Sequence, residues 1–364
     1  MTSPVPDVPD VVVVTGPGLV ADLRLLSETA EREFDRLGVR GRVVAAAGAA
    51  EVEALLASPE TPVVLPGPTR EVRALMARHP RAVWLDLHPV ADPAGPEHLH
   101  GRGVWGLVWA VRRAVHRLRR PARRIAYGPH PDQWAEVRPA RGAAGPAPVA
   151  VVLHGGYWRS IWGADLMDAL CADLAGRGLA AWNLEYRRPD RHGWAATTED
   201  VAAGVALAAR EAAGPLVVIG HSAGGQLALR AAADDHRVSL AVALAGVLDL
   251  VEADRRRLSA GAVAAALGGP AGEAPEVPEV YARSSPLERV PLKVPQLVVQ
   301  GGGDDPDLVD LGRRYARAAR AAGDDVTYLE MPGDHFDVID PASPIWRAAA
   351  GAIGDRLGGG SRRG

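Results

Sequence analysis

The sequence predicts an α/β protein of two domains, each built on a parallel sheet. Two observations lead to this prediction. Short apolar, β-branched runs alternate with segments of helical apolar spacing along most of the 364 residues, which is typical of parallel sheets covered by helices. The alternation stops in a stretch rich in Arg, Pro and Gly near residues 119–148 and then restarts, which indicates a domain boundary.

The first domain is predicted over residues 1–122. Its first strand, at 11–15, is an uninterrupted β-branched run that ends at Gly16-Pro-Gly18, which favours a strand buried on both faces and a turn at its exit. Further strands are expected at 42–47, 62–65 and 82–87, and helices at 23–37, 50–56, 70–77 and 103–118.

The second domain is predicted over residues 123–364, where the same alternation is more regular. It again indicates a parallel sheet with helices on both faces. Strands are expected at 149–153, 180–185, 215–220, 238–245, 296–300 and 326–331, and helices at 162–176, 197–213, 221–233, 308–323 and 344–357.

Composition excludes several classes of protein. Lys and Arg number 41 against 44 Asp and Glu, a formal net charge of −3, which argues against binding to nucleic acid. No apolar run approaches the ~20 residues that span a bilayer, and the N-terminal segment lacks the pattern of a signal peptide. A single cysteine, Cys171, excludes a disulfide framework and a cysteine-rich metal site. We expect a cytoplasmic protein with no metal or other cofactor, and no nucleic-acid or membrane partner.

The strongest chemical signal is Gly220-His-Ser222-Ala-Gly224, which fits the pattern G-x-S-x-G between an expected strand and an expected helix. Small residues on both sides of the serine allow a sharp turn, so that its hydroxyl projects above the sheet. We predict that Ser222 is a nucleophile. The alternative is a glycine-rich turn with a surface serine.

A second signal is the sequence His-Gly-Gly at 154–156, directly after the strand expected at 149–153. Serine hydrolases donate oxyanion-hole N–H groups from a loop at this position, and glycine lets the backbone approach a substrate. We predict that the amides of Gly155, Gly156 and Ala223 form an oxyanion hole. For His154 we predict a structural role.

The two residues that follow, Tyr157 and Trp158, are candidate substrate-binding residues. Trp158 and Trp162 fit either an aromatic wall for an aryl substrate or the hydrophobic core, which is the more common place for a tryptophan.

An acid and a histidine follow the last two expected strands. Acidic residues at 304, 305 and 307 come after one strand, and His335 comes after the other. The chain order Ser, Asp, His is that of a catalytic triad on an α/β sheet of this kind. We predict His335 as general base and Asp304 as the residue that orients it. Asp305 and Asp307 remain alternatives, although either also fits the N-cap of the next helix.

Residues 125–357 resemble α/β-hydrolases of the His-Gly-Gly-x-Trp type, a group that includes kynurenine formamidases (arylformamidases) and related carboxylesterases. The resemblance covers the whole second domain and implies its fold and triad. It does not identify the substrate, because enzymes with these motifs hydrolyse formamides and several kinds of ester. The matching motifs are Tyr127-Gly128, His154-Gly-Gly-Tyr-Trp158, Glu185-Tyr-Arg-Arg188, Gly220-His-Ser-Ala-Gly224, Ala245-Gly-Val-Leu-Asp249, Ser285-Pro286 and Gly333-Asp-His335-Phe336.

Residues 11–118 resemble type II 3-dehydroquinate dehydratases, which implies a flavodoxin-like fold. The motifs that carry the resemblance are 11–19, Trp84-Leu-Asp-Leu-His-Pro89 and 101–110. That family uses a tyrosine and an arginine on a lid loop, but this chain has no tyrosine before Tyr127. The family's substrate-binding asparagine is replaced by a segment that begins at Leu65, and only His88 occupies a family active-site position. We predict a non-catalytic domain. Because the family self-assembles, the resemblance favours a role in oligomerisation or docking, for example formation of a homo-oligomer through this domain.

Together these patterns predict a serine hydrolase that cleaves a small carboxyl ester or an aryl formamide through an acyl-enzyme, with an acyl or formyl small molecule as its partner. Two alternatives remain. The first domain would act as a 3-dehydroquinate dehydratase-type lyase, or both domains would serve only as a binding scaffold.

Overall fold

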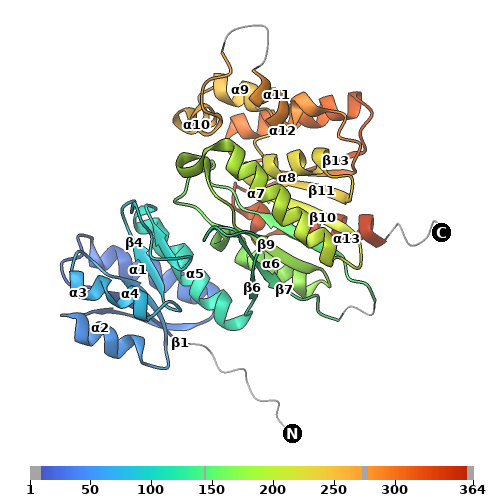
Figure 1. Ribbon diagram of the computed structural model, residues 1–364. Coiled ribbons are helices and arrows are strands. Elements are labelled where there is room, and N and C mark those ends of the chain that lie inside the picture. The colour runs from blue at the N-terminus through green and yellow to red at the C-terminus, as the bar shows by residue number, and fades with distance from the viewer. Residues whose placement is uncertain (1–9, 143–144, 273–277, 359–364) are drawn as a thin grey trace. The chain divides into compact units, whose positions relative to one another are not determined.

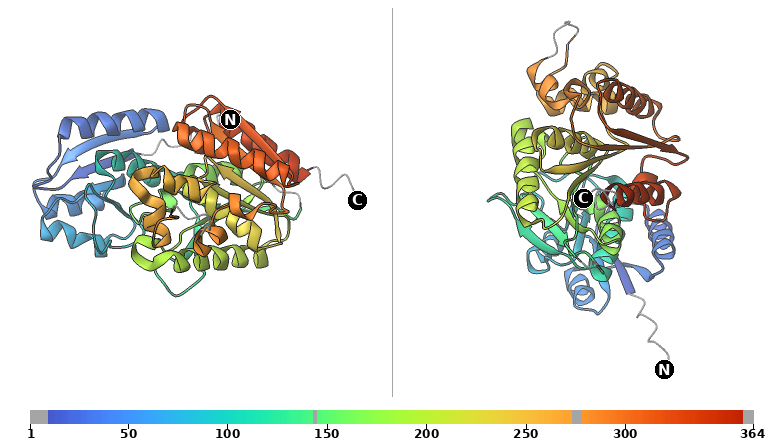
Figure 2. Two further views of the ribbon diagram at one scale, coloured as in Figure 1. Left: turned by 90° about the horizontal axis from the view of Figure 1, so that it is seen from above. Right: turned by 90° about the vertical axis from the view of Figure 1, so that its right-hand side faces the viewer.

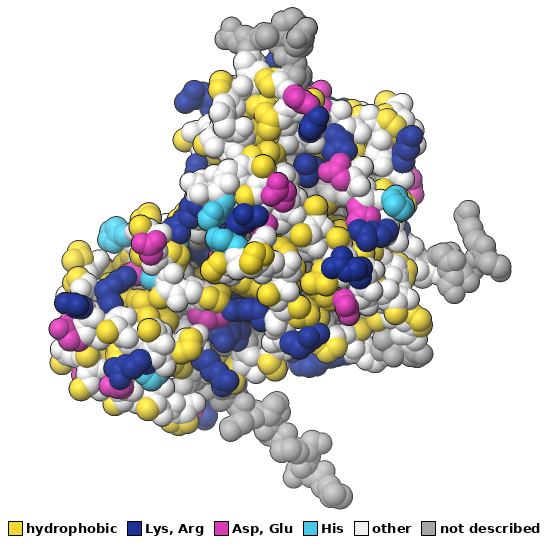
Figure 3. Space-filling model, viewed as in Figure 1, with side chains coloured by type: hydrophobic (Ala, Val, Ile, Leu, Met, Phe, Trp, Pro, Cys, Tyr) yellow, Lys and Arg dark blue, Asp and Glu magenta, His cyan; other side chains and the backbone are white. Residues whose placement is uncertain are grey.

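The computed structural model describes residues 10–142, 145–272 and 278–358 (Figure 1). The chain divides into two compact units, Met1–Pro121 and Ala122–Gly364. Among the described residues, no helix is both long enough and apolar enough to cross a membrane. On the face drawn in Figure 3, acidic and basic side chains are interspersed, as expected from the nearly balanced charge of the sequence.

The first unit contains a five-stranded parallel sheet in the order β2-β1-β3-β4-β5, which is the strand order of flavodoxin-like folds. The predicted fold class of this unit is therefore confirmed. Its strands are β1 (Asp10–Thr15), β2 (Arg40–Ala45), β3 (Thr61–Leu65), β4 (Val83–Asp86) and β5 (His98–His100). Its helices are α1 (Leu23–Leu37), α2 (Ala49–Leu56), α3 (Arg70–Arg73), α4 (Leu75–Arg78) and α5 (Gly106–Arg119), with a 3₁₀ turn at Gly103–Trp105.

Strand β1, which lies between β2 and β3, has the predicted burial, because the residues from Val11 to Val14 are all 0% exposed. Two local predictions differ from the structure. The helix expected at 70–77 is divided into α3 and α4, and β5 was not expected. Three residues in β5 are too few to show a strand period in a sequence.

The second unit contains an eight-stranded sheet in the order β13-β12-β11-β10-β8-β9-β7-β6. Only β7 runs antiparallel to its neighbours. The strands are β6 (Arg123–Ala126), β7 (Trp134–Arg138), β8 (Val149–Leu153), β9 (Ala180–Leu184), β10 (Leu216–His221), β11 (Val238–Leu244), β12 (Gln296–Gly301) and β13 (Val326–Met331). This is an α/β-hydrolase sheet, as predicted. Six of its eight strands were expected, and the sequence pattern did not indicate the antiparallel pair β6 and β7.

Helices cover both faces of this sheet. The right-hand view of Figure 2 shows α7 in green and α13 in dark red on opposite sides of it. One core cluster joins α7, α8 and α12 to one face, while α6 and α13 pack on the other. The helices are α6 (Asp168–Gly176), α7 (Pro189–Glu211), α8 (Ala223–Asp234), α9 (Leu250–Arg255), α10 (Leu258–Leu267), α11 (Glu279–Ser284), α12 (Pro306–Ala321) and α13 (Pro344–Gly358), with 3₁₀ turns at Ala164–Met167, Leu287–Arg289 and Asp337–Ile339.

Candidate active site

The turn from β10 to α8 has the geometry that the glycine pattern predicts. Ser222 lies between them with φ 55° and ψ −122°, a strained backbone conformation for a residue other than glycine. A Cβ atom at Gly220 would lie 1.9 Å from the carbonyl oxygen of Gly224, and one at Gly224 would lie 2.2 Å from that of Leu153. Only glycine fits at these two positions, and helix α8 consequently starts at Ala223 rather than at the predicted 221.

The structure brings His335 and Asp304 together beyond the ends of β13 and β12. Nδ1 of His335 donates to Oδ2 of Asp304 at 2.9 Å. The other carboxylate oxygen, Oδ1, accepts the backbone N–H of Asp305 at 2.7 Å, and Nε2 of Gln300 donates to Oδ2 at 2.9 Å. Burial opposes ionisation of Asp304, but the hydrogen bond and positive charge of His335, with these other donors, lower the pKa of the Asp304 carboxyl below its usual value.

The two alternative acids lie elsewhere. Asp305 is the N-cap of α12, and its Oδ1 accepts the backbone N–H of Asp307 at 2.9 Å. Asp307 forms an ion pair with Arg256 at 2.8 Å. The structure therefore places only Asp304, of the three candidates, against the imidazole of His335.

The histidine loop is held beside the serine turn through His221. Nε2 of His221 donates to the backbone carbonyl of His335 at 2.9 Å, and the two imidazole rings lie 4.7 Å apart between centroids. Burial, reinforced by the charge of His335, lowers the pKa of His221 to about 3. The hydrogen bond from a neutral His221 therefore connects the serine turn to the loop that carries His335, the predicted base.

The glycine loop after β8 lies against the serine turn from the other side. A Cβ atom at Gly155 would lie 2.7 Å from Cβ of Ser222, so the two residues are in direct contact. The backbone N–H groups of Gly155, Gly156 and Ala223 donate to no acceptor within the described part of the chain. Unpaired buried amides are rare in proteins, and this arrangement suits a ligand oxygen next to Ser222.

The two predicted substrate-binding residues differ in their surroundings. Trp158 is 1% exposed and donates its indole N–H to Oε1 of Gln226 at 3.2 Å, so it packs in the core beneath the loop. Tyr157 is half-buried. Burial, together with the charges of Asp305 and Asp304, raises the pKa of its phenol.

Trp162 contacts the same loop. A Cβ atom at Gly156 would lie 2.4 Å from three atoms of the Trp162 side chain, which is half-buried. The indole of Trp162 therefore lies directly against the second glycine of the predicted oxyanion hole. Of the two tryptophans, Trp162 has the place that an aromatic wall requires.

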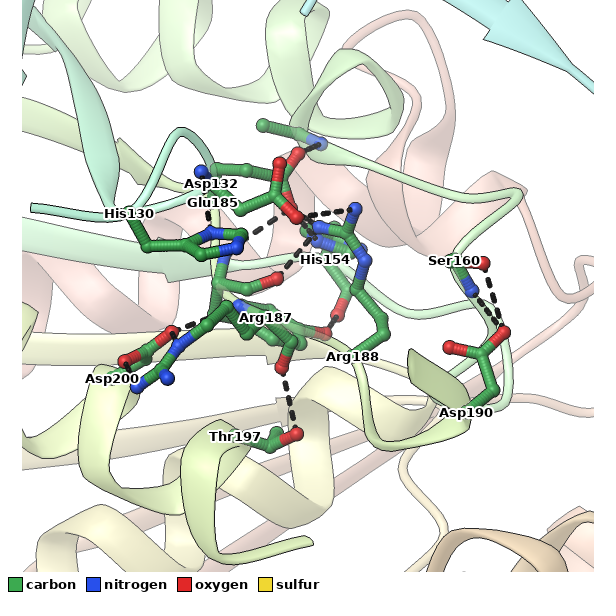
Figure 4. Close-up of polar contacts among 12 residues, drawn as sticks. His130, Asp132, His154, Ser160, Glu185, Arg187, Arg188, Asp190, Thr197 and Asp200 are labelled. Carbon is green, nitrogen blue, oxygen red and sulfur yellow. Dashed lines mark hydrogen bonds and ion pairs between the residues drawn. The ribbon is translucent and has the colours of Figure 1, made fainter. Parts of the chain in front are cut away.

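A buried charged network lies behind the glycine loop (Figure 4). Glu185 accepts a hydrogen bond from Nε2 of His154 at 3.0 Å and forms an ion pair with Arg188. Arg188 also lies 3.4 Å from a carboxylate oxygen of Asp132. The sequence pattern singled out the motif at 185–188 only by resemblance and gave it no role. Their partners His154 and Asp132 lie 31 and 56 residues away in the chain, so the network has no local signature.

Asp132 belongs to a group that could hold a metal ion. Ligand atoms of His130, Asp132 and His192 lie within 4.8 Å of one another. However, Nδ1 of His130 accepts the backbone N–H of Asp132 at 3.1 Å, and the Asp132 carboxylate pairs with Arg188. Because protein groups already engage two of the three candidate ligands, we assign no metal to this site.

In the first unit, Asp86 at the carboxyl end of β4 pairs with Arg73 of α3 and with His98, the first residue of β5. Asp86 binds Arg73 through two hydrogen bonds of 2.8 Å and His98 through one of 2.7 Å. Burial opposes ionisation of Asp86, but these donors hold its pKa well below the usual value. His88 is exposed and is not among the residues that bind Asp86.

Three comparisons relate this chain to known proteins. A family model for the alpha/beta hydrolase fold matches residues 150–339, just over half of the chain. Esterase LipC of Mycobacterium tuberculosis is 29% identical over 267 residues, which cover 64% of this chain and 62% of that protein, less than two thirds of its length.

Solved structures show the same similarity. A bacterial heroin esterase superimposes with a TM-score of 0.54 and 25% identity, covering 65% of this chain and 84% of its own. Esterase B of Lactobacillus rhamnosis superimposes with a TM-score of 0.57 over 71% of this chain and 93% of its own; at 16% identity this similarity concerns the fold alone.

Proposed function

This chain belongs to the family of proteins with the alpha/beta hydrolase fold, and we propose that it hydrolyses a small carboxylic ester or an aryl formamide. The observation that carries the proposal is the contact between Ser222 and a loop in which the N–H groups of Gly155 and Gly156 donate to no acceptor among the described residues. A strained, buried serine beside unpaired N–H groups has the arrangement needed to attack a carbonyl and to bind the resulting oxyanion. The similarity to esterases supports the same class of reaction.

In the proposed mechanism, His335 removes the proton from Oγ of Ser222 as that oxygen attacks the substrate carbonyl. Asp304 holds the imidazole through Nδ1 and stabilises the positive charge that it acquires. The carbonyl oxygen becomes negative and accepts hydrogen bonds from the amides of Gly155, Gly156 and Ala223. His335 then gives its proton to the leaving alcohol or amine, and an acyl-enzyme remains.

Water completes the reaction. His335 accepts a proton from a water molecule as it attacks the acyl-enzyme, and a second tetrahedral intermediate forms in the same hole. Its collapse releases the carboxylic acid and returns the proton to Ser222. No step requires a metal or an organic cofactor.

The substrate class rests on the motif resemblance and on the aromatic side chains near the glycine loop. Trp162 against Gly156 and the half-buried Tyr157 would provide an apolar wall for an aryl or short acyl group. Trp158 would act through the loop that it supports.

The test is hydrolysis of p-nitrophenyl acetate and of N-formylkynurenine by the purified protein, with Ser222→Ala as control. We expect turnover that the substitution abolishes, and the ratio of the two rates distinguishes an esterase from a formamidase. Turnover that survives in Ser222→Ala would contradict the mechanism.

For residues 1–122 we propose a non-catalytic relative of the type II 3-dehydroquinate dehydratases that acts in self-association. The mutual pairing of Asp86, Arg73 and His98 supports a domain without lyase chemistry. Turnover of 3-dehydroquinate by the protein would contradict this proposal, and sedimentation velocity would test self-association. The cytoplasmic location predicted from the sequence remains part of the same proposal.

A further inference from the structure

Glu185 and Tyr186 directly follow β9 and both contact the glycine loop after β8. Figure 4 shows Glu185 beside His154. We propose that this pair positions the oxyanion hole by fixing the carbonyl groups of His154 and Gly155, so that the amides of Gly155 and Gly156 point toward the substrate. The inference rests on the proposed function and assigns a role to a motif that the hydrolytic mechanism does not use.

Tyr186 fixes the first peptide group. Its O–H donates to the backbone carbonyl of His154 at 2.7 Å, and the side chain is 0% exposed. That carbonyl and the N–H of Gly155 belong to one planar trans peptide and therefore point in opposite directions. Because the carbonyl points to Tyr186, the N–H of Gly155 points away from it.

His154 fixes the second peptide group by the same geometry. Its Nδ1 donates to the backbone carbonyl of Gly155 at 2.8 Å, which directs the N–H of Gly156 away from the ring. The imidazole itself is held on two sides. Nε2 donates to Glu185 at 3.0 Å, and the ring stacks on Tyr186 with centroids 4.4 Å apart and planes 10° apart.

Glu185 ties together the two ends of the loop. Its Oε1 binds His154, where the loop starts, and also accepts the backbone N–H of Tyr186 at 3.1 Å. Its Oε2 accepts the backbone N–H of Ala164, where the loop ends, at 3.0 Å. Although burial opposes ionisation, the charges of Arg188 and His154 lower the pKa of Glu185 to about 2, so this carboxyl is ionised at neutral pH.

The loop needs such support because its own backbone is strained. Gly156, Tyr157 and Trp158 have φ values of 107°, 49° and 56°, and left-handed conformations at residues other than glycine cost free energy that the surroundings must offset. Donors that are already oriented before the reaction stabilise an oxyanion best, because no reorganisation is needed. Loss of a carbonyl contact is therefore expected to impair the transition state more than substrate binding.

The test compares Tyr186→Phe with Tyr281→Phe. Tyr281 is a matched control because it is also 0% exposed and donates its O–H to a backbone carbonyl, that of Gly269, at 2.9 Å. Each substitution removes one buried hydroxyl and keeps the ring. We expect a lower melting temperature in both variants, since each loses a hydrogen bond to a backbone carbonyl. The decrease in Tyr281→Phe should be at least as large, because the Tyr281 hydroxyl also interacts with Asp254.

Catalysis distinguishes them. Loss of a whole oxyanion donor costs about 10²–10³ in kcat, and a misdirected donor should cost part of that. For Tyr186→Phe we expect kcat with p-nitrophenyl acetate to fall about tenfold while KM changes less than twofold. Inhibition by an aryl trifluoromethyl ketone, which forms a tetrahedral adduct with a nucleophilic serine, should weaken by a similar factor. A Tyr186→Phe variant with kcat and inhibition within twofold of wild type would overturn the inference.

Hydrogen exchange provides a readout that does not depend on turnover. In Tyr186→Phe, amides in the segment 154–158 should exchange faster than in wild type, whereas Tyr281→Phe should leave that segment unchanged. Unchanged exchange in Tyr186→Phe would also overturn the inference. If wild-type protein hydrolyses neither test substrate, the proposed function fails, but the exchange comparison still decides whether Tyr186 orients this loop.

Discussion

Substitution of Gly156 by alanine tests the predicted oxyanion hole at its most restricted position. The glycine has φ 107°, which disfavours any residue with a Cβ atom. An added Cβ would also lie 2.4 Å from Cβ, Cγ and Cδ1 of Trp162, well inside van der Waals contact. Alanine therefore requires both a strained backbone and a displacement of either the loop or the indole.

The magnitude follows from these two effects. A left-handed conformation costs alanine roughly 1–2 kcal/mol, and 1 kcal/mol corresponds to about 2–4 °C in melting temperature for a unit of this size. Strain alone should therefore lower the melting temperature by roughly 2–8 °C. A shift of the loop that withdraws one donor from the oxyanion should lower kcat by about 10²–10³.

The assay is steady-state hydrolysis of p-nitrophenyl acetate together with thermal unfolding. Gly323→Ala is a matched control, because Gly323 has φ 92° and an added Cβ would meet nothing within 4 Å. It should show the loss of stability without the loss of kcat. The Gly156→Ala substitution should also lower kcat less in a Trp162→Ala background than in wild type, because the side chain that the added Cβ would meet is then absent. A Gly156→Ala variant with kcat within threefold of wild type would refute the assignment.

Two further predictions concern the acids. Asp304→Asn should lower kcat by about 10³–10⁴, because the imidazole loses the partner that fixes its tautomer. Asp305→Asn should keep kcat within threefold, since Asp305 only caps α12. Comparable kcat values for the two variants would argue against this distinction. The pKa of Glu185 falls from 4.5 to about 2 on folding, so its ionised form stabilises the protein above pH 4.5, and this stabilisation is lost as the pH falls toward 2. The Glu185→Gln variant should therefore lose about 3 kcal/mol of unfolding free energy at pH 7 and clearly less near pH 3 in urea unfolding; an equal loss at both pH values would contradict the charged network.

The serine turn and the glycine loop could be predicted because their geometry is encoded locally. Gly220, Ser222 and Gly224 lie within five consecutive positions of one strand-turn-helix unit, and the steric reason for each glycine involves its neighbours in sequence or the adjacent strand. The same applies to strands that are continuous buried apolar runs, such as β1 and β8.

The sequence left open which acid lies beside His335. Three carboxylates lie within four residues, and their roles depend on direction. Asp304 faces His335, Asp305 faces its own helix, and Asp307 faces Arg256. Only the fold determines which of them meets a histidine thirty-one residues away in the chain.

The missed strands β6 and β7 have a different cause. Two charged residues of β7, Glu136 and Arg138, are 5% and 3% exposed, which no hydrophobic pattern would indicate. Arg124 pairs with Glu136 at 2.7 Å, and Asp168 pairs with Arg138 at 3.0 Å. A buried charge is stable only when a tertiary partner neutralises it. Because these partners come from other elements, the sequence of β7 alone did not indicate a buried strand.

The central claim is that Ser222 is an activated nucleophile, and the most direct measurement is labelling of the full-length protein with a fluorophosphonate, followed by mass spectrometry of the intact chain and its peptides. Such reagents react with an activated serine and form a stable adduct on its oxygen. We predict one adduct per chain, located on Ser222, and none in Ser222→Ala. Wild-type protein without an adduct, or with an adduct that persists in Ser222→Ala, would contradict the account.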